Sequence, residues 1–372
     1  MFKILHVAET LPGGTASYLN DLIGELHASD PMLDLVIAGP AGQNHHLSLP
    51  DVRYVGVVYP GRSPSGLWQF AASLRQVIRR EVPDIIHAHG SFPGAVVRVL
   101  RALGQCGCAK IVYCAHGWAF DRKLGTVTGR LFAGVERLLA RWTDVIVNIS
   151  RHEERIALAN GLAREKLRLV ENAIRLPPAG APRASYRDQG PLRVLFVGRL
   201  DRQKGADIAC HVIAALKKRR AVEFTLIGEA VVSNDTPLPL PAGCHLRGWL
   251  PREEVYNAYR AADVLLMPSR WEGFGLVAVE AMSVGTPVVA ARVGGLQDII
   301  EDGHDGWLFA AEDENAALEI LARLTAADIR AAGALASDKA RRHYGIERLG
   351  AQIGSIYRDL CAAGDNRSSP RG

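Results

Sequence analysis

The sequence predicts an α/β protein of two doubly wound domains in tandem, and three observations carry this prediction. Short runs rich in Val and Ile alternate with helical patterns along most of the chain. The alternation stops at residues 172–191, where Pro, Gly and Ala predominate with little periodicity, as in a linker. The length of 372 residues fits two domains of ordinary size.

The first half of the chain contains six predicted strands that are short, apolar and polar mainly at their ends. Such strands are typical of a parallel sheet that is buried on both faces. They cover residues 3–8, 35–38, 53–57, 84–87, 110–114 and 144–148. Helices are predicted between them at residues 65–81, 91–103 and 126–142. We therefore expect a first domain over residues 1–175.

The same alternation restarts after the linker and predicts a second domain over residues 190–344. Its strands are expected at residues 193–197, 223–227, 264–267 and 287–290. Its helices are expected at residues 206–219, 252–261, 275–284 and 296–301. An amphipathic stretch at residues 346–362 then predicts a last helix. Ligands of parallel sheets bind beyond the carboxyl ends of the strands, so the cleft between the two domains is the expected site.

The composition excludes several classes of protein. Hydrophobic residues make up 48% and charged residues 22%, which excludes a mainly disordered chain. No run of 18 apolar residues is present, so no membrane span is expected, and the N-terminus is interpreted as a buried strand rather than a signal peptide. The six Cys residues match neither a disulfide framework nor a paired zinc site, which favours a cytoplasmic location.

The net charge of +5 lies entirely in the first half. Residues 1–180 hold 20 Lys and Arg against 15 Asp and Glu, whereas the remaining residues hold 24 of each. This excess indicates either a solvated basic face or attraction to anionic phosphate, on lipid head groups or on a phosphorylated acceptor.

A basic segment follows the first strand of the second domain. The segment from Gly198 to Gly205 carries Arg199 and Lys204 between its two glycines. A bidentate Arg, a Lys and closely approaching backbone suit a diphosphate at the start of the next helix. We expect both side chains to face solvent in the cleft. The alternative is a polar turn with solvated cations.

Two carboxylates follow a later strand, eight residues apart. Glu272 lies in a loop and Glu280 in the helix that begins near Gly275. An ionised Glu accepts hydrogen bonds from sugar hydroxyls, and a helix N-terminus favours an anion. The alternative is a helix cap with a solvated Glu. The match to a dinucleotide-binding glycine pattern is discounted, because that pattern belongs to the first turn of such a domain.

Two further motifs lie at strand ends of the first domain. Gly13 and Gly14 follow the first strand and permit close approach to phosphate, unless they only make a tight turn. His116 follows the strand at residues 110–114 and can bind a sugar hydroxyl, unless it is an ordinary polar loop residue. His87 is interpreted as structural, and His89 as lying near the acceptor.

Motifs for other chemistries are missing from the sequence. No Asp-x-Asp pair is present to hold a metal ion on a sugar nucleotide, and no metal site is predicted. The sequence contains neither the nucleophile elbow of esterases nor a P-loop.

Taken together, these motifs resemble those of the retaining glycosyltransferases of "group 1", family 4, which have the GT-B fold of two Rossmann-like domains. The resemblance covers essentially the whole chain. It rests on the N-terminal Gly pair, on the Ala-His-Gly at His116, on residues 198–205, and on Glu-x7-Glu at residues 272–280 with the continuation EAMSVGTPVVAARVGGLQDIIEDGHDGWLF. The chain departs from the family at residues 228–230, where the usual Gly-x-Gly is Gly-Glu-Ala. It also departs at the hinge, where residues 172–175 are Asn-Ala-Ile-Arg in place of the usual Asn-Gly-Val-Asp.

The resemblance implies a role for each site residue. Arg199 and Lys204 would bind the donor diphosphate, Glu280 the ribose, and His116 the donor sugar. Glu272 would bind the transferred sugar and phosphate together with backbone groups. The other residues expected to contact the donor are Gly14, Gly198, Phe274, Gly275 and Leu276. The helix at about residues 346–364 would cross back onto the first, acceptor-side domain.

The resemblance also implies the reaction. It is metal-independent transfer of a hexose-type sugar, with retention, from a nucleotide-sugar donor to a sugar or polyprenyl-diphosphate-linked acceptor. The expected setting is bacterial exopolysaccharide, capsule or O-antigen assembly, with UDP slightly preferred over GDP, no other cofactor and no nucleic acid partner. The alternatives are a phosphorylase-like enzyme of the same architecture, a non-catalytic module that binds sugar nucleotides or lipid, and a dehydrogenase, which the misplaced glycine pattern disfavours.

Mixed basic and aromatic residues of the first domain predict contact with an anionic membrane, from the cytoplasmic face. One stretch lies on the helix at residues 65–81 and the other follows His116. The residues concerned are Trp68, Phe70, Arg75, Arg79, Arg80, Trp118, Phe120, Arg122, Lys123, Leu124, Arg130, Phe132, Arg137 and Arg141. The alternative is that the apolar members pack inward and the arginines are merely solvated.

Overall fold

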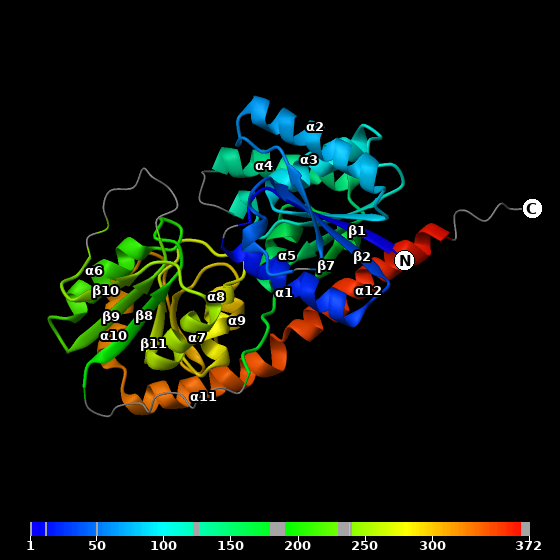
Figure 1. Cartoon of the computed structure of the whole chain (residues 1–372). Coiled ribbons are helices and arrows are strands. Elements are labelled where there is room, and N and C mark those ends of the chain that lie inside the picture. The colour runs from blue at the N-terminus through cyan, green and yellow to red at the C-terminus, as the bar shows by residue number, and fades with distance from the viewer. Residues whose placement is uncertain are drawn as a thin grey trace, which may run out of the picture. The chain divides into compact units, whose positions relative to one another are not determined.

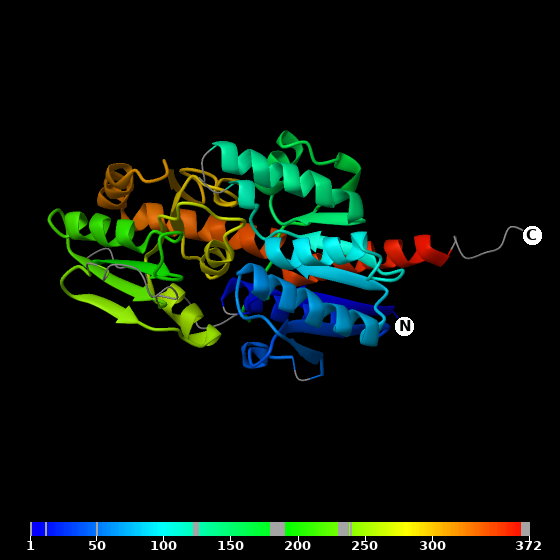
Figure 2. The same cartoon turned by 90° about the horizontal axis from the view of Figure 1, so that it is seen from above.

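The chain folds into two compact units, Met1–Asn172 with Ile346–Gly372, and Ala173–Gly345 (Figure 1). The computed structural model describes residues 2–11, 13–49, 51–121, 126–178, 190–229, 238 and 240–365. Each unit is a parallel sheet with helices on both faces, so the predicted α/β fold of two Rossmann-like domains is confirmed (Figures 1 and 2). Part of the predicted linker, residues 179–189, lies outside the described residues.

The first unit holds a seven-stranded sheet in the order β3-β2-β1-β4-β5-β6-β7 within the described part of the chain. All of its strand pairs are parallel. The strands are β1 (Phe2–Ala8), β2 (Leu33–Pro40), β3 (Arg53–Val57), β4 (Ile85–His89), β5 (Lys110–Cys114), β6 (Val145–Asn148) and β7 (Leu167–Leu169).

The helices of the first unit cover the two faces of this sheet. They are α1 (Gly14–Ser29), α2 (Pro64–Glu81), α3 (Ser91–Ala102), α4 (Thr126–Leu139), α5 (Arg151–Ala159) and α12 (Ile346–Asp365). Figure 1 shows α2, α3 and α4 on one side, and α1 with α12 on the other. Because side chains alternate along a strand, Leu5 and Val7 of β1 join the apolar core on the α2 side, whereas His6 faces the opposite side.

The second unit holds a six-stranded parallel sheet in the order β10-β9-β8-β11-β12-β13 within the described residues. Its strands are β8 (Leu192–Val197), β9 (Val222–Ile227), β10 (Cys244–Arg247), β11 (Val264–Met267), β12 (Val288–Ala291) and β13 (Gly306–Phe309). Its helices are α6 (Ala206–Leu216), α7 (Arg252–Ala261), α8 (Leu276–Ser283), α9 (Leu296–Ile299), α10 (Glu314–Arg323) and α11 (Ala326–His343). Residues of α6 and α10 share one apolar core with the sheet.

The structure differs from the sequence prediction mainly at short elements. The strands β7, β10 and β13, which have three or four residues each, were not predicted. The predicted strand at residues 84–87 extends to His89, which pairs with Ala8 of β1 and Cys114 of β5. The helix predicted to residue 142 ends as an α-helix at Leu139 and continues as one 3-10 turn.

Within the described residues, no helix combines the length and the apolar character that crossing a membrane requires.

Candidate active site

The loops after β8 and β11 lie together at the carboxyl edge of the second unit's sheet, because these two strands are hydrogen-bonded neighbours. The backbone N–H of Arg270 joins the loops by donating to the carbonyl of Gln203 at 2.8 Å. Gly205 permits this approach: its φ is 71°, and a Cβ there would lie 2.2 Å from the carbonyl oxygen of Pro268. A side chain at position 205 would therefore push the loops apart.

Lys204 and Glu272 form an ion pair between these loops. Nζ of Lys204 lies 2.6 Å from Oε1 of Glu272, and the hydroxyl of Ser269 donates to the same oxygen at 2.9 Å. The side chain of Glu272 is 6% exposed and that of Lys204 19%. Lys204 is therefore less exposed than expected, because the buried carboxylate of Glu272 holds its ammonium.

Arg199 is held less tightly than Lys204. Its guanidinium donates to Oε1 of Gln203 at 2.7 Å and lies 3.2 Å from the carboxylate of Asp201. The side chain is 38% exposed, so its guanidinium is accessible to solvent. Gly198 lies against the stem of Lys204, since a Cβ at that position would be 3.5 Å from its Cγ.

The start of α8 carries the other predicted residues of this unit. Gly275 is the left-handed N-cap of α8, with a φ of 109°, and Leu276 is the first helical residue. The ring of Phe274 is buried edge-on against Tyr344, with centroids 5.7 Å apart. Within the described residues, no side chain accepts a hydrogen bond from the first N–H groups of α8. These N–H groups can therefore donate to an anion at the start of the helix.

Glu280 lies one turn further along α8, where the hydroxyl of Tyr259 donates to its Oε2 at 3.0 Å. Burial, together with the charge of Glu280, raises the pKa of Tyr259 well above its usual value. Tyr259 therefore stays a hydrogen-bond donor and fixes the direction of the carboxylate.

Gly294 packs against the backbone of the loop that carries Glu272. Its φ is 50°, and a Cβ there would lie 1.6 Å from the carbonyl oxygen of Glu272. The turn before α9 therefore supports the Glu272 loop through direct backbone contact.

In the first unit, Gly14 begins α1 and is exposed, and a Cβ there would meet nothing within 4 Å. Four residues later on the same helix, Tyr18 lies edge-on against the ring of His116, with centroids 4.6 Å apart. Tyr18 therefore connects the helix that starts at Gly14 with His116.

His116 is partly buried behind the end of β5. Its Nε2 lies 3.1 Å from Nδ1 of His89, and burial lowers the pKa of His116 to about 4. The backbone of His116 is left-handed, with a φ of 51°. The next residue, Gly117, donates its N–H to Oε1 of Glu153 at 2.6 Å.

Glu153 holds the loop around His116 in place. Its carboxylate also accepts from the N–H of Ile149 at 3.0 Å, and burial raises the pKa of Glu153 to about 7. Ser150 caps the same turn by accepting from the N–H of Glu153. The pattern Ser-x-x-Glu is a capping signature that could have identified Glu153 from the sequence.

Known proteins resemble this chain over both units. The family model "Glycosyl transferase 4-like domain" matches residues 13–173, and the model "Glycosyl transferases group 1" matches residues 191–327. The 41.2 kDa protein in the cps region of Klebsiella pneumoniae is 31% identical over 327 residues, which are 86% of this chain and 89% of that protein. The chain belongs to the group 1 glycosyltransferases.

Other similar proteins agree with this assignment. The UDP-Gal:alpha-D-GlcNAc-diphosphoundecaprenol alpha-1,3-galactosyltransferase of Escherichia coli is 26% identical over 272 residues, 68% of this chain and 69% of that enzyme. Sucrose-phosphate synthase from Thermosynechococcus elongatus has the same fold, with a TM-score of 0.80, 23% identity and coverage of 98% and 100% of the two chains. Anabaena Alr3699/HepE in complex with UDP-glucose superposes with a TM-score of 0.75, 19% identity and coverage of 96% and 100%. The glycosyltransferase thus has the GT-B fold.

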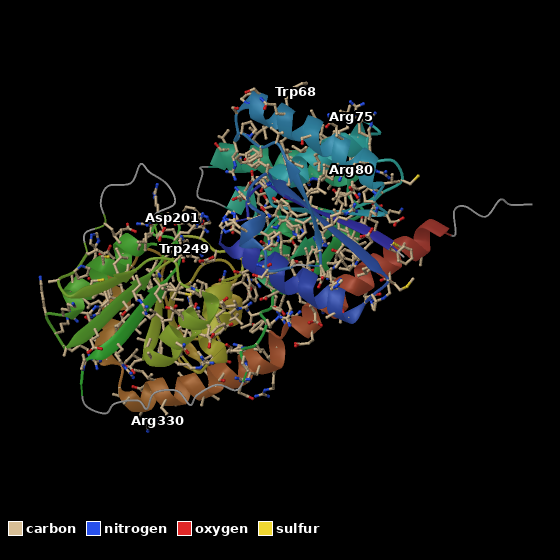
Figure 3. All side chains as sticks on the ribbon, viewed as in Figure 1. Trp68, Arg75, Arg80, Asp201, Trp249 and Arg330 are labelled. Atoms are coloured by element: carbon tan, nitrogen blue, oxygen red, sulfur yellow. The ribbon has the colours of Figure 1, made fainter. Side chains whose placement is uncertain are left out.

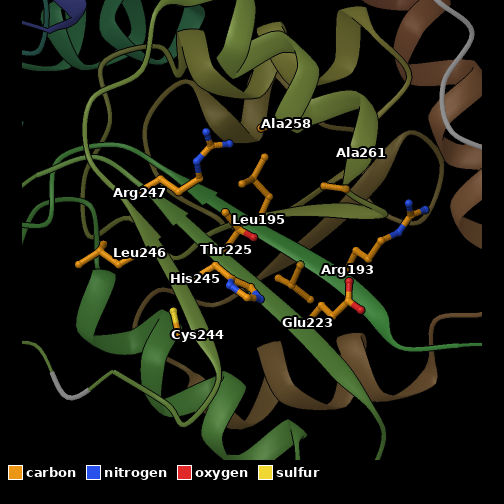
Figure 4. A pocket seen from close by; sticks show the side chains of 12 residues that line it. Arg193, Leu195, Glu223, Thr225, Cys244, His245, Leu246, Arg247, Ala258 and Ala261 are labelled. Atoms are coloured by element: carbon orange, nitrogen blue, oxygen red, sulfur yellow. The ribbon is translucent and has the colours of Figure 1, made fainter.

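A separate cavity of the glycosyltransferase, of about 570 Å³, lies on the second unit between α7 and the strands β8, β9 and β10 (Figure 4). Its polar lining includes Arg193, Glu223, His245 and Arg247. None of the predicted site residues lines it.

The predicted residues of the glycosyltransferase fall into two sets, one in each unit. Gly14 and His116 belong to the first unit, and the others belong to the second. Sequence reasoning missed the side chains that hold these residues. The missed residues are His6, Tyr18, Glu153, Gln203, Tyr259 and Ser269, whereas His89 was named from the sequence but without its bond to His116.

The membrane prediction needs correction at two aromatic residues. Phe70 and Trp118 are buried in the core of the first unit, because each lies on the inner side of its segment. Trp68 is 73% exposed and lies along α2 with Arg75 and Arg80 (Figure 3). The predicted contacts of Arg122, Lys123 and Leu124 lie outside the described residues.

Proposed function

We propose that this glycosyltransferase moves a hexose-type sugar from a nucleotide-sugar donor to a sugar or lipid-linked acceptor, with retention and without a metal ion. The observation that carries the proposal is the junction of two loops at the edge of one sheet. At that junction Arg199 donates to Gln203, whose amide donates to the carbonyl of Trp271, and Lys204 donates to Glu272. Two cations beside a carboxylate suit a ligand that has both a diphosphate and sugar hydroxyls.

On this proposal Arg199 and Lys204 bind the donor diphosphate, together with backbone at Gly198. Glu280, directed by Tyr259, accepts from the ribose hydroxyls. Glu272 accepts from hydroxyls of the transferred sugar. The N–H groups at Phe274, Gly275 and Leu276 meet the phosphate at the start of α8, where the helix dipole favours an anion.

The first unit contributes His116 and Gly14 to the same donor. His116 bonds a hydroxyl of the transferred sugar. The open space at Gly14, where a Cβ would touch nothing, leaves the start of α1 accessible to a phosphate.

The chemistry follows from where charge develops. Breaking the bond between sugar and phosphate leaves positive charge on the sugar and negative charge on the diphosphate. Arg199 and Lys204 stabilise the departing diphosphate with fixed positive charge, so no metal ion is needed for that step. The acceptor hydroxyl attacks from the side that the phosphate leaves, and the phosphate takes its proton, so the configuration is retained.

The similar proteins favour a particular donor and acceptor class. Alr3699/HepE binds UDP-glucose, which supports a UDP-sugar over a GDP-sugar. The Escherichia coli relative acts on a sugar linked to diphosphoundecaprenol, and the Klebsiella relative lies in a cps region. We therefore propose a polyprenyl-diphosphate-linked acceptor in capsule, exopolysaccharide or O-antigen assembly.

A lipid-linked acceptor calls for contact with a membrane, and α4 offers a surface for it. Val127, Leu131, Val135 and Leu138 repeat at helical spacing and are all exposed, with Leu131 at 66%. The exposed Arg130 and Arg137 lie on the same helix. An apolar stripe with basic neighbours suits an anionic lipid surface, which we propose is the inner face of the plasma membrane.

A thermal-shift screen of UDP- and GDP-sugars, followed by transfer of the labelled sugar, tests the proposal. A specific donor at 100 times its Kd stabilises the protein by roughly 2.7 kcal/mol. Transfer that yields the same anomer as in the donor supports the proposal, and an inverted product refutes retention. Binding with neither hydrolysis nor transfer would favour a non-catalytic module, and phosphate-dependent cleavage of a glycan would favour a phosphorylase.

A further inference from the structure

Three imidazole rings of the first unit form a hydrogen-bonded chain that ends at His116. Nδ1 of His6 lies 3.0 Å from Nε2 of His89, and Nδ1 of His89 lies 3.1 Å from Nε2 of His116. The ring centroids are 5.3 Å apart in both pairs, and the ring planes of the first pair are nearly parallel, at 8°. In each pair the ring centroids lie much further apart than the two hydrogen-bonded nitrogens. The nitrogens therefore point at each other from the facing edges of the two rings.

The sheet places the rings of His6, His87 and His89 on one of its faces. In the parallel pairing of β1 with β4, His6 lies opposite His87 and Ala8 lies opposite His89. Side chains two residues apart share a face, so His6, His87 and His89 all project to the side of the sheet where α1 and α12 pack. Tyr18 of α1 and Tyr357 of α12 contact these rings from above.

The hydrogen bonds couple the protonation of all three rings. Burial lowers the pKa of His6 to about 3 and that of His116 to about 4, and lowers the pKa of His89 well below its usual value, so the rings are neutral. A neutral imidazole has one N–H and one lone pair. If Nδ1 of His6 donates, then Nδ1 of His89 also donates, and His116 must carry its proton on Nδ1. The reverse arrangement puts every proton on Nε2.

The buried end of the chain decides between these two arrangements. Nε2 of His6 is buried and has no hydrogen-bond partner among the described residues. A proton there would be an unpaired buried donor, whereas a lone pair is an unpaired acceptor, and buried unpaired N–H groups are the rarer case. The protons therefore lie on the Nδ1 atoms.

We propose that His89, supported by His6, is a positioning residue that holds His116 as a hydrogen-bond donor through Nδ1. No described residue bonds that nitrogen, so it can donate to an oxygen of the donor substrate. This last step rests on the proposed function. The proposal explains why two buried histidines, His6 and His89, lie in line behind His116, the residue that meets the ligand.

A metal ion explains the same cluster less well. His6, His87 and His89 offer nitrogens within 4.8 Å of one another. However, both nitrogens of His89 and one of His6 already bond other histidines, and Nδ1 of His87 lies 2.6 Å from the hydroxyl of Tyr357. Only Nε2 of His6 and Nε2 of His87 remain, which is fewer than the three protein ligands of typical zinc sites.

The tautomers can be measured in the free protein by long-range 1H–15N correlation of 15N-histidine at pH 7. We expect His6, His89 and His116 all in the Nδ1–H form, with assignments from the variants His6→Leu, His89→Leu and His116→Gln. An Nε2–H form for His89 or His116 in the wild type would overturn the proposal. A stoichiometric metal found by elemental analysis of the purified protein would replace it with a metal site.

Activity supplies the second measurement, with His87→Leu as the matched control on the same strand. We expect His89→Leu to lower kcat/KM by about 10-fold to 100-fold. His89→Asn, which can still pair with Nε2 of His116, should recover part of that loss, and His87→Leu should stay near the wild-type value. Equal loss in His87→Leu would show that packing alone matters. Absence of any transfer by the wild type would refute the proposed function while leaving the tautomer result intact.

Discussion

Nζ of Lys204 and Oε1 of Glu272 are 2.6 Å apart, which joins the loop after β8 to the loop after β11. The two side chains were predicted to bind different parts of one ligand. Their ion pair means that the diphosphate of a bound donor competes with Glu272 for the ammonium. Donor binding on the proposed mechanism therefore exchanges one anionic partner of Lys204 for another and releases Glu272 toward the sugar.

Replacing Lys204 should cost both stability and activity. Lys204→Met leaves the carboxylate of Glu272 buried without its cation, so we expect a loss of about 1–3 kcal/mol in the free energy of unfolding in urea. We also expect turnover to fall by about 10²-fold to 10³-fold. Lys339→Met is the control, because Lys339 forms a similar 2.7 Å pair with the buried Asp305 of the same unit. The control should lose stability alone; full turnover in Lys204→Met would refute the diphosphate role.

Variants of the two glutamates should differ in their affinity for free UDP, measured by calorimetry. Glu280→Gln should weaken binding, because the ribose loses its carboxylate. Glu272→Gln should bind UDP at least as tightly as the wild type, because Lys204 is no longer neutralised, yet transfer should be damaged. Equal loss of UDP affinity in both variants would contradict the assignment of Glu280 to the ribose and Glu272 to the transferred sugar.

Transfer should survive EDTA. Arg199 and Lys204 supply the positive charge on the diphosphate that a divalent ion supplies in other enzymes. The test is the rate of transfer after dialysis against EDTA, and again after adding Mg²⁺ or Mn²⁺. A strict requirement that either ion restores would contradict this assignment of charge.

The buried histidines should make the fold sensitive to acid. Burial lowers the pKa of His6 to about 3 and that of His116 to about 4, and the pKa values of His87 and His89 move the same way. The unfolded chain, with histidine pKa values near 6.5, binds more protons below that pH, so stability is lost as the pH falls through this window. Each histidine contributes at most about 1.4 kcal/mol per pH unit.

Glu153 acts in the opposite direction. Burial raises its pKa from 4.5 to about 7, so the folded state binds the extra proton and this contribution falls as the pH rises between those values. Urea unfolding from pH 4.5 to 7.5 measures both effects. We expect His6→Leu to flatten the dependence of stability on pH and Glu153→Gln to steepen it. If the free energy of unfolding depends on pH with the same slope in the wild type, His6→Leu and Glu153→Gln, these two pKa shifts do not control the stability.

The apolar runs were sufficient to predict a parallel sheet in each unit, because buried parallel strands are mostly apolar, although β7, β10 and β13 were missed. Arg199, Glu272 and Glu280 were found because they follow strands in sequence. The partners of these residues were not predictable in the same way. The pairing of Lys204 with Glu272 depends on β8 lying beside β11, an order that a single sequence does not specify.

The histidine chain shows the same limit. His6, His89 and His116 come from three segments, and only the register of β1 against β4 brings the first two together. A polar residue within an apolar strand, such as His6 in β1, is a signal that could have been used. It indicates a buried polar partner, since buried polar groups are nearly always hydrogen-bonded.

Membrane contact should depend on the outward face of α4. Flotation with anionic liposomes at low and high salt measures it, and zwitterionic liposomes give the background. Each cation near the surface contributes about 1 kcal/mol and is screened within a Debye length, so we expect binding at low salt that high salt weakens.

The double variant Leu131→Ser with Val135→Ser should reduce flotation through lost apolar burial, and Arg130→Glu with Arg137→Glu through repulsion. Arg323→Glu, on an exposed site of the second unit, is the matched control and should float as the wild type does. Binding that is absent at low salt, or that both double variants leave unchanged, would refute the membrane surface and leave the glycosyltransferase assignment as it stands.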